Sequence, residues 1–319
     1  MTPRENFIHF LRAEPYDWVP SNLDILQFRP AFIPDHVARG FVAQQNPYSG
    51  PYGGVDLLGV EWVHQPEAGG SMEKAPLFDD IEEWEDYVVF PSLDAMDWES
   101  CAAENADYLN TDKLIATTLY TGYFERLISF VGFENAAMAL VDEDQQEAVA
   151  RLFERLTDFY IDYIIRLHRH FGVDMVEIHD DWGTQISTMF SPETHRKNIL
   201  PHLSRLVSAA HNTGVFIEQH SCGKVDELVP NIIESGVDTW KGQPIVDAQG
   251  LVEKYGRIFN FGITMLLDAP LDDSEVIAAI DSQLEKFKGK GIWLGIFGKA
   301  LKPHQKQLAA EYLRTKKPL

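Results

Sequence analysis

The 319-residue sequence predicts an α/β fold built on a parallel sheet. From about residue 113 onward, short runs of β-branched and apolar residues alternate with amphipathic stretches of helical period. Strands that alternate with helices are joined by right-handed crossovers and pair in parallel. Seven strands are expected, close to the eight of a closed barrel, and a doubly wound open sheet has a similar local pattern.

The expected elements alternate along the chain. The strands are 19–23, 114–121, 174–179, 215–220, 237–241, 258–264 and 292–297, and the helices are 4–13, 142–171, 191–212, 224–235, 249–255 and 273–288. The ends of helix 191–212 are well defined, because Ser191 and Pro192 suit an N-cap and a first turn and Gly214 lies two positions after its last residue. The chain has no Gly-x-Gly-x-x-Gly turn, which removes the main support for a dinucleotide-binding open sheet.

Residues 25–112 depart from this alternation. They contain a glycine-rich segment at 48–54, an expected hairpin around Gly69 and Gly70, and an acidic stretch at 79–86. We expect one barrel domain spanning residues 1–319, with 25–112 inserted after the first strand as a cap over the barrel mouth.

The charge balance narrows the choice of partners. Lys and Arg total 27 against 49 Asp and Glu, a formal net charge of −22. Such a surface repels phosphate backbones and anionic membranes, so neither nucleic acid nor a membrane is expected as a partner.

The first residues lack the pattern of a secretory signal, and the two cysteines, Cys101 and Cys222, are too few for a disulfide framework. A cytoplasmic location is expected.

The segment 218–223, Glu-Gln-His-Ser-Cys-Gly, is the most informative part of the chain. It ends an apolar strand, and alternate side chains of a strand share a face, so Glu218, His220 and Cys222 point the same way. These residues are able to converge on one ion or substrate. The simpler interpretation is a buried polar cluster in which the cysteine acts as a small hydrophobic residue.

The preceding strand favours a functional cleft. Residues 177–183 read Glu-Ile-His-Asp-Asp-Trp-Gly, one βα unit upstream. Several ionisable residues at neighbouring strand ends are poorly explained by packing, because unpaired buried carboxylates are strongly disfavoured. A catalytic zinc site needs three protein ligands and an open position. The candidate metal ligands are His220, Cys222 and a carboxylate, for which Glu177 and Glu218 are the choices.

Five motifs together carry a family resemblance. They are Asp180–Gln185, Ser191–Glu193, His220–Pro230, Gly122–Arg126 and Gly236–Asp238. On these motifs the chain resembles the uroporphyrinogen decarboxylase superfamily, and within it the corrinoid-dependent methyltransferases. The resemblance implies a (β/α)8 barrel of the TIM type with its site at the C-terminal mouth.

The resemblance also bears on the substrate. Decarboxylases of the family grip a tetrapyrrole with an arginine-rich segment near the N-terminus, whereas residues 18–29 contain only Arg29. The methyltransferase branch holds zinc through a His-x-Cys pair, matched by His220 and Cys222, and a distant second cysteine that this sequence lacks. A carboxylate in its place makes the ligand set harder and better suited to an oxygen ligand such as a methyl ether.

The resemblance therefore implies a methyltransferase of the O-demethylating kind. It would bind one zinc ion and pass a methyl group from a small, methoxylated aromatic donor to cobalt(I) of a separate corrinoid protein. His179 and the adjacent acids Asp180 and Asp181 are the catalytic candidates, the acids as proton donors to the leaving oxygen. The candidates for aromatic walls around the donor are Tyr123, Phe124, Trp182 and Trp240, although core packing is the more common role of each such residue.

Two other functions stay open at this point. One is a metal-free decarboxylase or lyase of a small acid, using Asp180, His179 and His220. The other is a non-catalytic barrel that binds a corrinoid or tetrapyrrole. The sequence leaves the identity of the methyl donor open, as well as the choice between a monomer and a homodimer.

Overall fold

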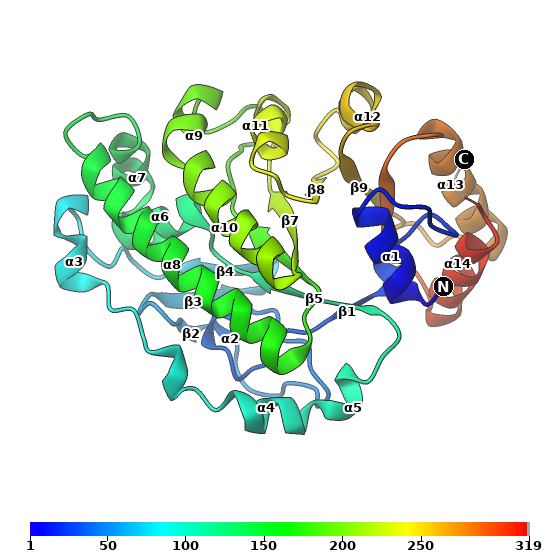
Figure 1. Ribbon diagram of the computed structural model, residues 1–319, viewed down its shortest axis with the longest axis horizontal. Helices are drawn as coiled ribbons and strands as arrows, with labels where there is room; N and C mark the ends of the chain where they lie inside the picture. Colours follow the sequence, from blue (N-terminus) through cyan, green and yellow to red (C-terminus); the bar gives the residue numbers. More distant parts are fainter. Residues whose placement is uncertain (318–319) are drawn as a thin grey trace.

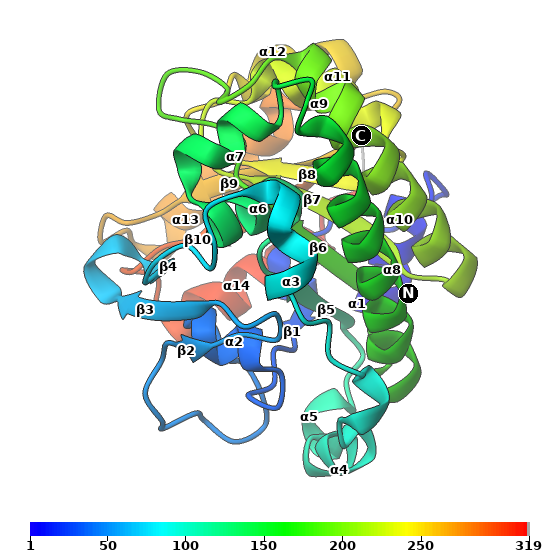
Figure 2. The same ribbon diagram turned by 90° about the vertical axis from the view of Figure 1, so that its left-hand side faces the viewer.

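The computed structural model describes residues 1–317 of the chain. A curled parallel sheet surrounded by helices forms the centre of the molecule (Figures 1 and 2). Its strands follow in the order β1 (Ile25–Gln27), β5 (Leu114–Leu119), β6 (Met175–His179), β7 (Phe216–Ser221), β8 (Thr239–Gly242), β9 (Asn260–Leu266) and β10 (Ile292–Phe297). All neighbours are parallel. A parallel bridge between Ser21 and Leu294 connects the segment before β1 to β10, so the sheet closes on itself. The predicted α/β barrel-type fold is confirmed.

The first strand begins later than predicted. Residues 19–23 were expected to be extended, but the extended segment is β1, residues 25–27. A 3-10 turn, η1 (Asn22–Asp24), interrupts the run because Ser21 and Asp24 form a capping box: the Ser21 hydroxyl accepts from the Leu23 N–H and the Asp24 carboxylate accepts from the Ser21 N–H. The segment therefore touches β10 before this turn and β5 after it.

The helices outside the insertion lie around the barrel. They are α1 (Pro3–Leu11), α6 (Tyr123–Val131), α7 (Phe133–Ala139), α8 (Gln146–Phe171), α9 (Pro192–Asn198), α10 (Leu200–Thr213), α11 (Val229–Glu234), α12 (Ala248–Tyr255), α13 (Asp273–Lys286) and α14 (Pro303–Arg314), with a 3-10 turn η5 (Asp226–Leu228) before α11. Within residues 1–317, no helix combines the length and apolar character needed to cross a membrane.

Two differences from the predicted helices have local causes. The expected helix 191–212 is divided into α9 and α10, because Pro201 lacks an N–H and its ring disfavours a continuous helix through residue 197. Helices α6 and α7 do not emerge from the sequence pattern, because segments of nine and seven residues are too short to show a clear period. The missed α14 follows β10 at the end of the described chain.

An apolar plug fills the N-terminal end of the barrel. Phe7 and Phe10 of α1 pack against Ile25, Met175 and Trp293, which point inward from the strands. All five side chains are at least nine-tenths buried. Because strand side chains alternate, the residues two and four positions after Ile25 and Met175 also point inward, nearer to the C-terminal mouth.

The insertion forms a small layer beside the barrel, apart from α11 and α12 (Figures 1 and 2). It contains α2 (Pro34–Arg39), the antiparallel strands β2 (Gly54–Val55), β3 (Glu61–Gln65) and β4 (Gly70–Glu73), and the helices α3 (Trp84–Tyr87), α4 (Trp98–Glu104) and α5 (Ala106–Leu109), with 3-10 turns η2 (Pro66–Ala68), η3 (Ile81–Glu83) and η4 (Leu93–Ala95). The expected hairpin is present as the antiparallel pair β3 and β4, and Gly69, at a φ of 82°, ends the turn that precedes β4. The buried Arg126 of α6 bonds Asp56 and Asp35 of the insertion, at 2.5 and 3.3 Å.

Candidate metal site

The polar side chains of β6 and β7 are stacked in layers above the apolar plug. Glu177 lies in register with Glu218, and His179 with His220. Parallel partners in register point to the same face, so the glutamates form one layer and the histidines the next, nearer to the mouth. The two imidazole rings have centroids 5.0 Å apart.

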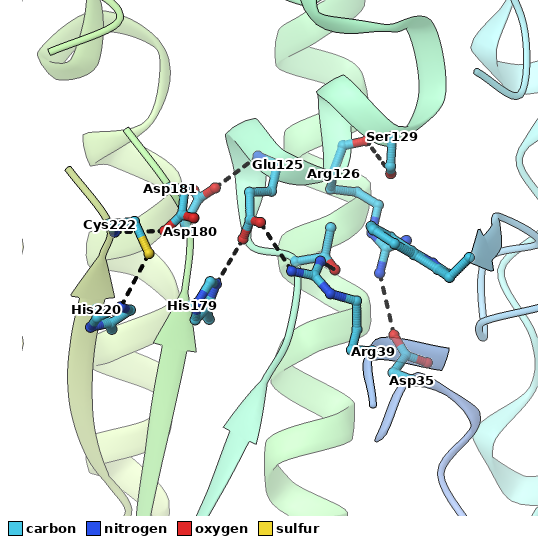
Figure 3. Close-up of polar contacts among 12 residues, drawn as sticks. Asp35, Arg39, Glu125, Arg126, Ser129, His179, Asp180, Asp181, His220 and Cys222 are labelled. Atoms are coloured by element: carbon cyan, nitrogen blue, oxygen red, sulfur yellow. Dashed lines mark hydrogen bonds and ion pairs between the residues drawn. The ribbon is translucent and has the colours of Figure 1, made fainter. Parts of the chain in front are cut away.

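Four side chains converge above these strands. One ligand atom from each of His179, Asp181, His220 and Cys222 lies within 4.8 Å of the others (Figure 3). Cys222 Sγ lies 3.7 Å from His220 Nε2. Two imidazole nitrogens, a sulfur and a carboxylate oxygen are ligands that zinc accepts, so this cluster has the composition of a metal site.

His220 is held with one nitrogen free. Its Nδ1 donates to the backbone carbonyl of Lys241 at 2.7 Å, which leaves the lone pair on Nε2, the atom nearest Cys222. Burial and the neighbouring charge of His179 lower the pKa of His220 to about 4. A backbone acceptor on the remote nitrogen is the arrangement that fixes a ligating histidine.

His179 is held in the same way by a side chain. Its Nδ1 lies 2.9 Å from Glu125 Oε2, so its Nε2 faces the cluster. Burial opposes a charge on this ring, but Glu125, Cys222 and Asp181 together raise the pKa of His179 well above its usual value. A metal would replace the proton on Nε2, so binding there would release a proton.

Close contact between two loops brings Asp181 and Cys222 together. Asp181 Oδ1 accepts from the Cys222 N–H at 2.6 Å, which leaves Oδ2 for the cluster. Gly223, at a φ of 81°, lies so near the backbone of Gly183 that a Cβ atom would overlap it. Burial raises the pKa of the Cys222 thiol, so a thiolate there needs a cation beside it.

The structure does not bring the predicted ligands Glu177 and Glu218 into this cluster. Both carboxylates bond Lys241 Nζ, at 2.5 and 2.8 Å. Burial raises the pKa of Glu218 to about 8, whereas Lys241 overcomes burial and lowers the pKa of Glu177. The two glutamates lie one layer too deep, and the lysine that engages them comes from β8.

The structure also separates the adjacent aspartates. Asp180 is fully buried and accepts the backbone N–H groups of Tyr123, Phe124 and Glu125, at 2.8, 3.1 and 2.8 Å. It therefore caps the first turn of α6, against burial that raises its pKa to about 7. Asp181, one residue later, points into the cluster. The two acids do not share a site where one proton would serve both.

The four aromatic side chains expected around the donor lie in the core. Tyr123, Phe124, Trp182 and Trp240 are 1, 0, 0 and 2% exposed, and all pack among apolar residues. Sequence reasoning missed Tyr120, whose ring centroid lies 5.8 Å from that of His179. Alternation along β5 was the available signal, because Thr118 is in register with Glu177 and Tyr120 follows two residues later.

Sequence reasoning also gave no role to Arg29. Ile25 points inward at the barrel bottom, and alternation places Gln27 and Arg29 on the same face nearer the mouth. Arg29 Nη1 donates to Gln27 Oε1 at 3.2 Å, and its buried Nε has no hydrogen-bond partner. Among residues 1–317, no carboxylate lies within ion-pair distance of this arginine.

The comparisons with known proteins agree with the sequence motifs at the level of the superfamily. Residues 121–265 match the family model described as uroporphyrinogen decarboxylase (URO-D), and this range contains the whole cluster. The match supports the uroporphyrinogen decarboxylase superfamily and an enzymatic role, without distinguishing among its branches. No curated protein gives a significant match to the chain.

Solved structures share only the general architecture. A sugar phosphate isomerase/epimerase from Parabacteroides distasonis is 11% identical with a TM-score of 0.39, and covers 68% of this chain and 75% of its own. A 3-keto-L-gulonate-6-phosphate decarboxylase from Vibrio cholerae is 10% identical with a TM-score of 0.32, and covers 68% and 79%. Similarities this low add no argument to the strand order above.

Proposed function

We propose that this chain is a zinc-dependent methyltransferase that moves a methyl group from a small methoxylated aromatic compound to cobalt(I) of a separate corrinoid protein. One observation carries the metal part of the proposal. Two histidines, each fixed through Nδ1 by a second partner, direct Nε2 towards the same thiol and carboxylate. Such outer partners are typical of ligating histidines.

The residues fit a zinc ion. A tetrahedral zinc holds a nitrogen and a sulfur ligand about 3.5 Å apart, and His220 Nε2 and Cys222 Sγ are 3.7 Å apart. The carboxylate that belongs to this cluster is Asp181, rather than Glu177 or Glu218. We assign His179, His220 and Cys222 as the residues that would hold zinc, with His179 in the place of the second cysteine of the methyltransferase branch. Asp181 is then the fourth group, beside the position a substrate oxygen would occupy.

The protein groups have separate tasks in this reaction. A bound zinc ion supplies Lewis acidity, which eases departure of a phenolic oxygen. Asp181 Oδ2 would carry the proton that this oxygen takes up as its bond to the methyl carbon breaks. Cobalt(I) of the corrinoid protein would be the methyl acceptor and would supply the electron pair of the new bond to carbon. The Tyr120 ring beside His179 would offer an aromatic surface for the donor, and it is itself stacked on Phe41, with ring centroids 5.2 Å apart.

A metal-free decarboxylase or lyase of a small acid is the second candidate. The unpaired Arg29 favours an anionic ligand inside a chain of net charge −22, and the matching family model is named for a decarboxylase. An anionic methoxybenzoate would satisfy Arg29 equally well under the first proposal. The two functions therefore differ in their need for a metal, which only the methyltransferase requires.

The test measures metal and methyl transfer together. The purified protein should hold about one zinc per chain, and with a cobalt(I) corrinoid protein and a methoxybenzoate it should convert the cobalt(I) spectrum to that of methylcobalt(III). Cys222→Ala should lose both properties, whereas Cys101→Ala, which changes the buried cysteine of α4, should keep both. Full transfer by Cys222→Ala, or release of carbon dioxide from a small acid by metal-free protein, would overturn the proposal.

A further inference from the structure

Arg39, the last residue of α2, connects the insertion to the barrel mouth. Its Nη1 donates to Thr121 Oγ1 at 2.8 Å and its Nη2 to Glu125 Oε1 at 3.2 Å. The guanidinium carbon lies 4.4 Å from the ring centroid of Trp62 and 5.8 Å from that of Tyr120. Only 8% of the residue is exposed, and its two Nη atoms are hydrogen-bonded while its buried Nε has no hydrogen-bond partner.

Glu125 is shared between this arginine and the cluster (Figure 3). One carboxylate oxygen accepts from Arg39 and the other from Nδ1 of His179, at 2.9 Å. The backbone N–H of Glu125 is bound to Asp180, so the start of its side chain is fixed as well. Arg39 therefore acts on the direction of the Glu125 carboxylate, and through it on the direction of His179 Nε2.

The turn between β5 and α6 provides a second connection. Thr121 has a φ of 67°, a region that β-branched residues rarely adopt. Its hydroxyl accepts from Arg39 and its carbonyl oxygen from the Tyr160 hydroxyl at 3.0 Å. A strained turn persists only where its surroundings hold it, so loss of Arg39 would let this turn relax and carry Glu125 with it.

We propose that Arg39 is a positioning residue for the metal site, which makes metal affinity depend on how the insertion docks. The inference rests on the proposed metal site and goes beyond it, because it assigns a role to a residue of the insertion that lies outside the four-residue cluster. The partners of ligating groups typically change metal affinity by about 10- to 100-fold when they are removed.

The experiment measures metal affinity directly. Dissociation constants for zinc and cobalt(II) are obtained by competition with a chromophoric chelator, and the visible spectrum of the cobalt(II) protein reports its coordination. Arg39→Met should weaken binding by about 10-fold or more and alter the cobalt(II) spectrum, and Arg39→Lys should lie between it and the unchanged protein. In a Glu125→Gln background, Arg39→Met should add less than about a threefold further loss, because it acts through Glu125.

Arg126→Lys is the matched control. Arg126 joins the same insertion to the same helix, and its guanidinium group donates to Asp56 and Asp35 rather than to the Glu125 carboxylate. If this variant and Arg39→Lys weaken metal binding equally, the effect comes from general docking and the inference is overturned. Unchanged metal affinity in both Arg39 variants overturns it too.

Two measurements distinguish a failure of the positioning role from the absence of a metal site and from misfolding. An unchanged protein that binds neither zinc nor cobalt(II) overturns the proposed function itself, whereas binding that ignores Arg39 overturns only the positioning role. Thermal unfolding of the metal-free variants shows whether Arg39→Met folds. If Arg39→Met does not fold, the metal affinity and the cobalt(II) spectrum of Arg39→Lys test the positioning role instead.

Discussion

His179 and His220 occupy equivalent positions on adjacent strands and use the same nitrogen for different outer partners. Nδ1 of His179 faces a carboxylate, whereas Nδ1 of His220 faces a backbone carbonyl. The carboxylate belongs to a helix that the insertion contacts, but the carbonyl is part of the barrel. One ligand of the cluster is therefore tied to the insertion and the other to the sheet.

The adjacent aspartates should respond to mutation in opposite ways. Asp180→Asn keeps one acceptor but loses bonds to the first turn of α6, so the free energy of unfolding should fall by about 1 to 2 kcal/mol. Asp181→Asn keeps the acceptor for the Cys222 N–H, so stability should change by less than about 0.5 kcal/mol while methyl transfer is lost. Urea unfolding and transfer rates measure both, and equal effects of the two changes would contradict the separation described here.

Gly223 should be essential for the cluster because of space as well as conformation. Gly214 and Gly223 have φ values of 86° and 81°, but nothing lies within 4 Å of a Cβ at Gly214, whereas a Cβ at Gly223 would overlap Gly183. Gly214→Ala should cost about 1 kcal/mol of stability and leave metal binding intact. Gly223→Ala should also weaken metal binding at least tenfold, as chelator competition would show. Equal metal affinity in the two variants would rule out the loop contact as a determinant of the site.

Lys241 should be a large contributor to stability despite its position beneath the cluster. Its Nζ contacts the carboxyl groups of both Glu177 and Glu218, whose side chains are 17 and 2% exposed. Lys241→Met leaves buried acids without their cation and should lower the free energy of unfolding by about 3 to 5 kcal/mol. Adding Glu177→Gln and Glu218→Gln should recover part of that loss. Chemical denaturation compares the variants, and a stability unaffected by Lys241→Met would show that the acids need no cation.

Acid should destabilise the protein partly through His36. This residue is fully buried, with Nδ1 bonded to the Pro30 carbonyl, and burial lowers its pKa from 6.5 to about 4. Between these values the unfolded chain takes up a proton that the folded chain does not, so stability falls as the pH decreases from 6.5 towards 4, by at most about 3 kcal/mol. His36→Gln should flatten that part of the stability profile measured by denaturation at each pH. An unchanged slope would remove His36 from the explanation.

Apart from the first, the strands of the barrel could be predicted because their apolar runs are local, and alternation then placed His220 and Cys222 on one face. Which carboxylate joins the cluster, Asp181 or one of the two glutamates, could not be decided from the sequence. This choice depends on the register between the strands and on Lys241, a residue of another strand whose ammonium group binds both glutamates. Asp180 is of a residue type that often acts as a catalytic acid, and only the position of α6 shows that it caps a helix. Arg39 and Glu125 depend on the docking of the insertion, which no local pattern encodes.

The plug formed by Phe7, Phe10 and Trp293 has a kinetic consequence. Because apolar side chains fill that end, a ligand would reach the histidines from the C-terminal mouth. If the proposed methyl transfer takes place there, a small donor would have to bind before a corrinoid protein covers the mouth, and the product would leave only after that protein dissociates. The proposed function therefore implies ordered binding, with the small molecule first.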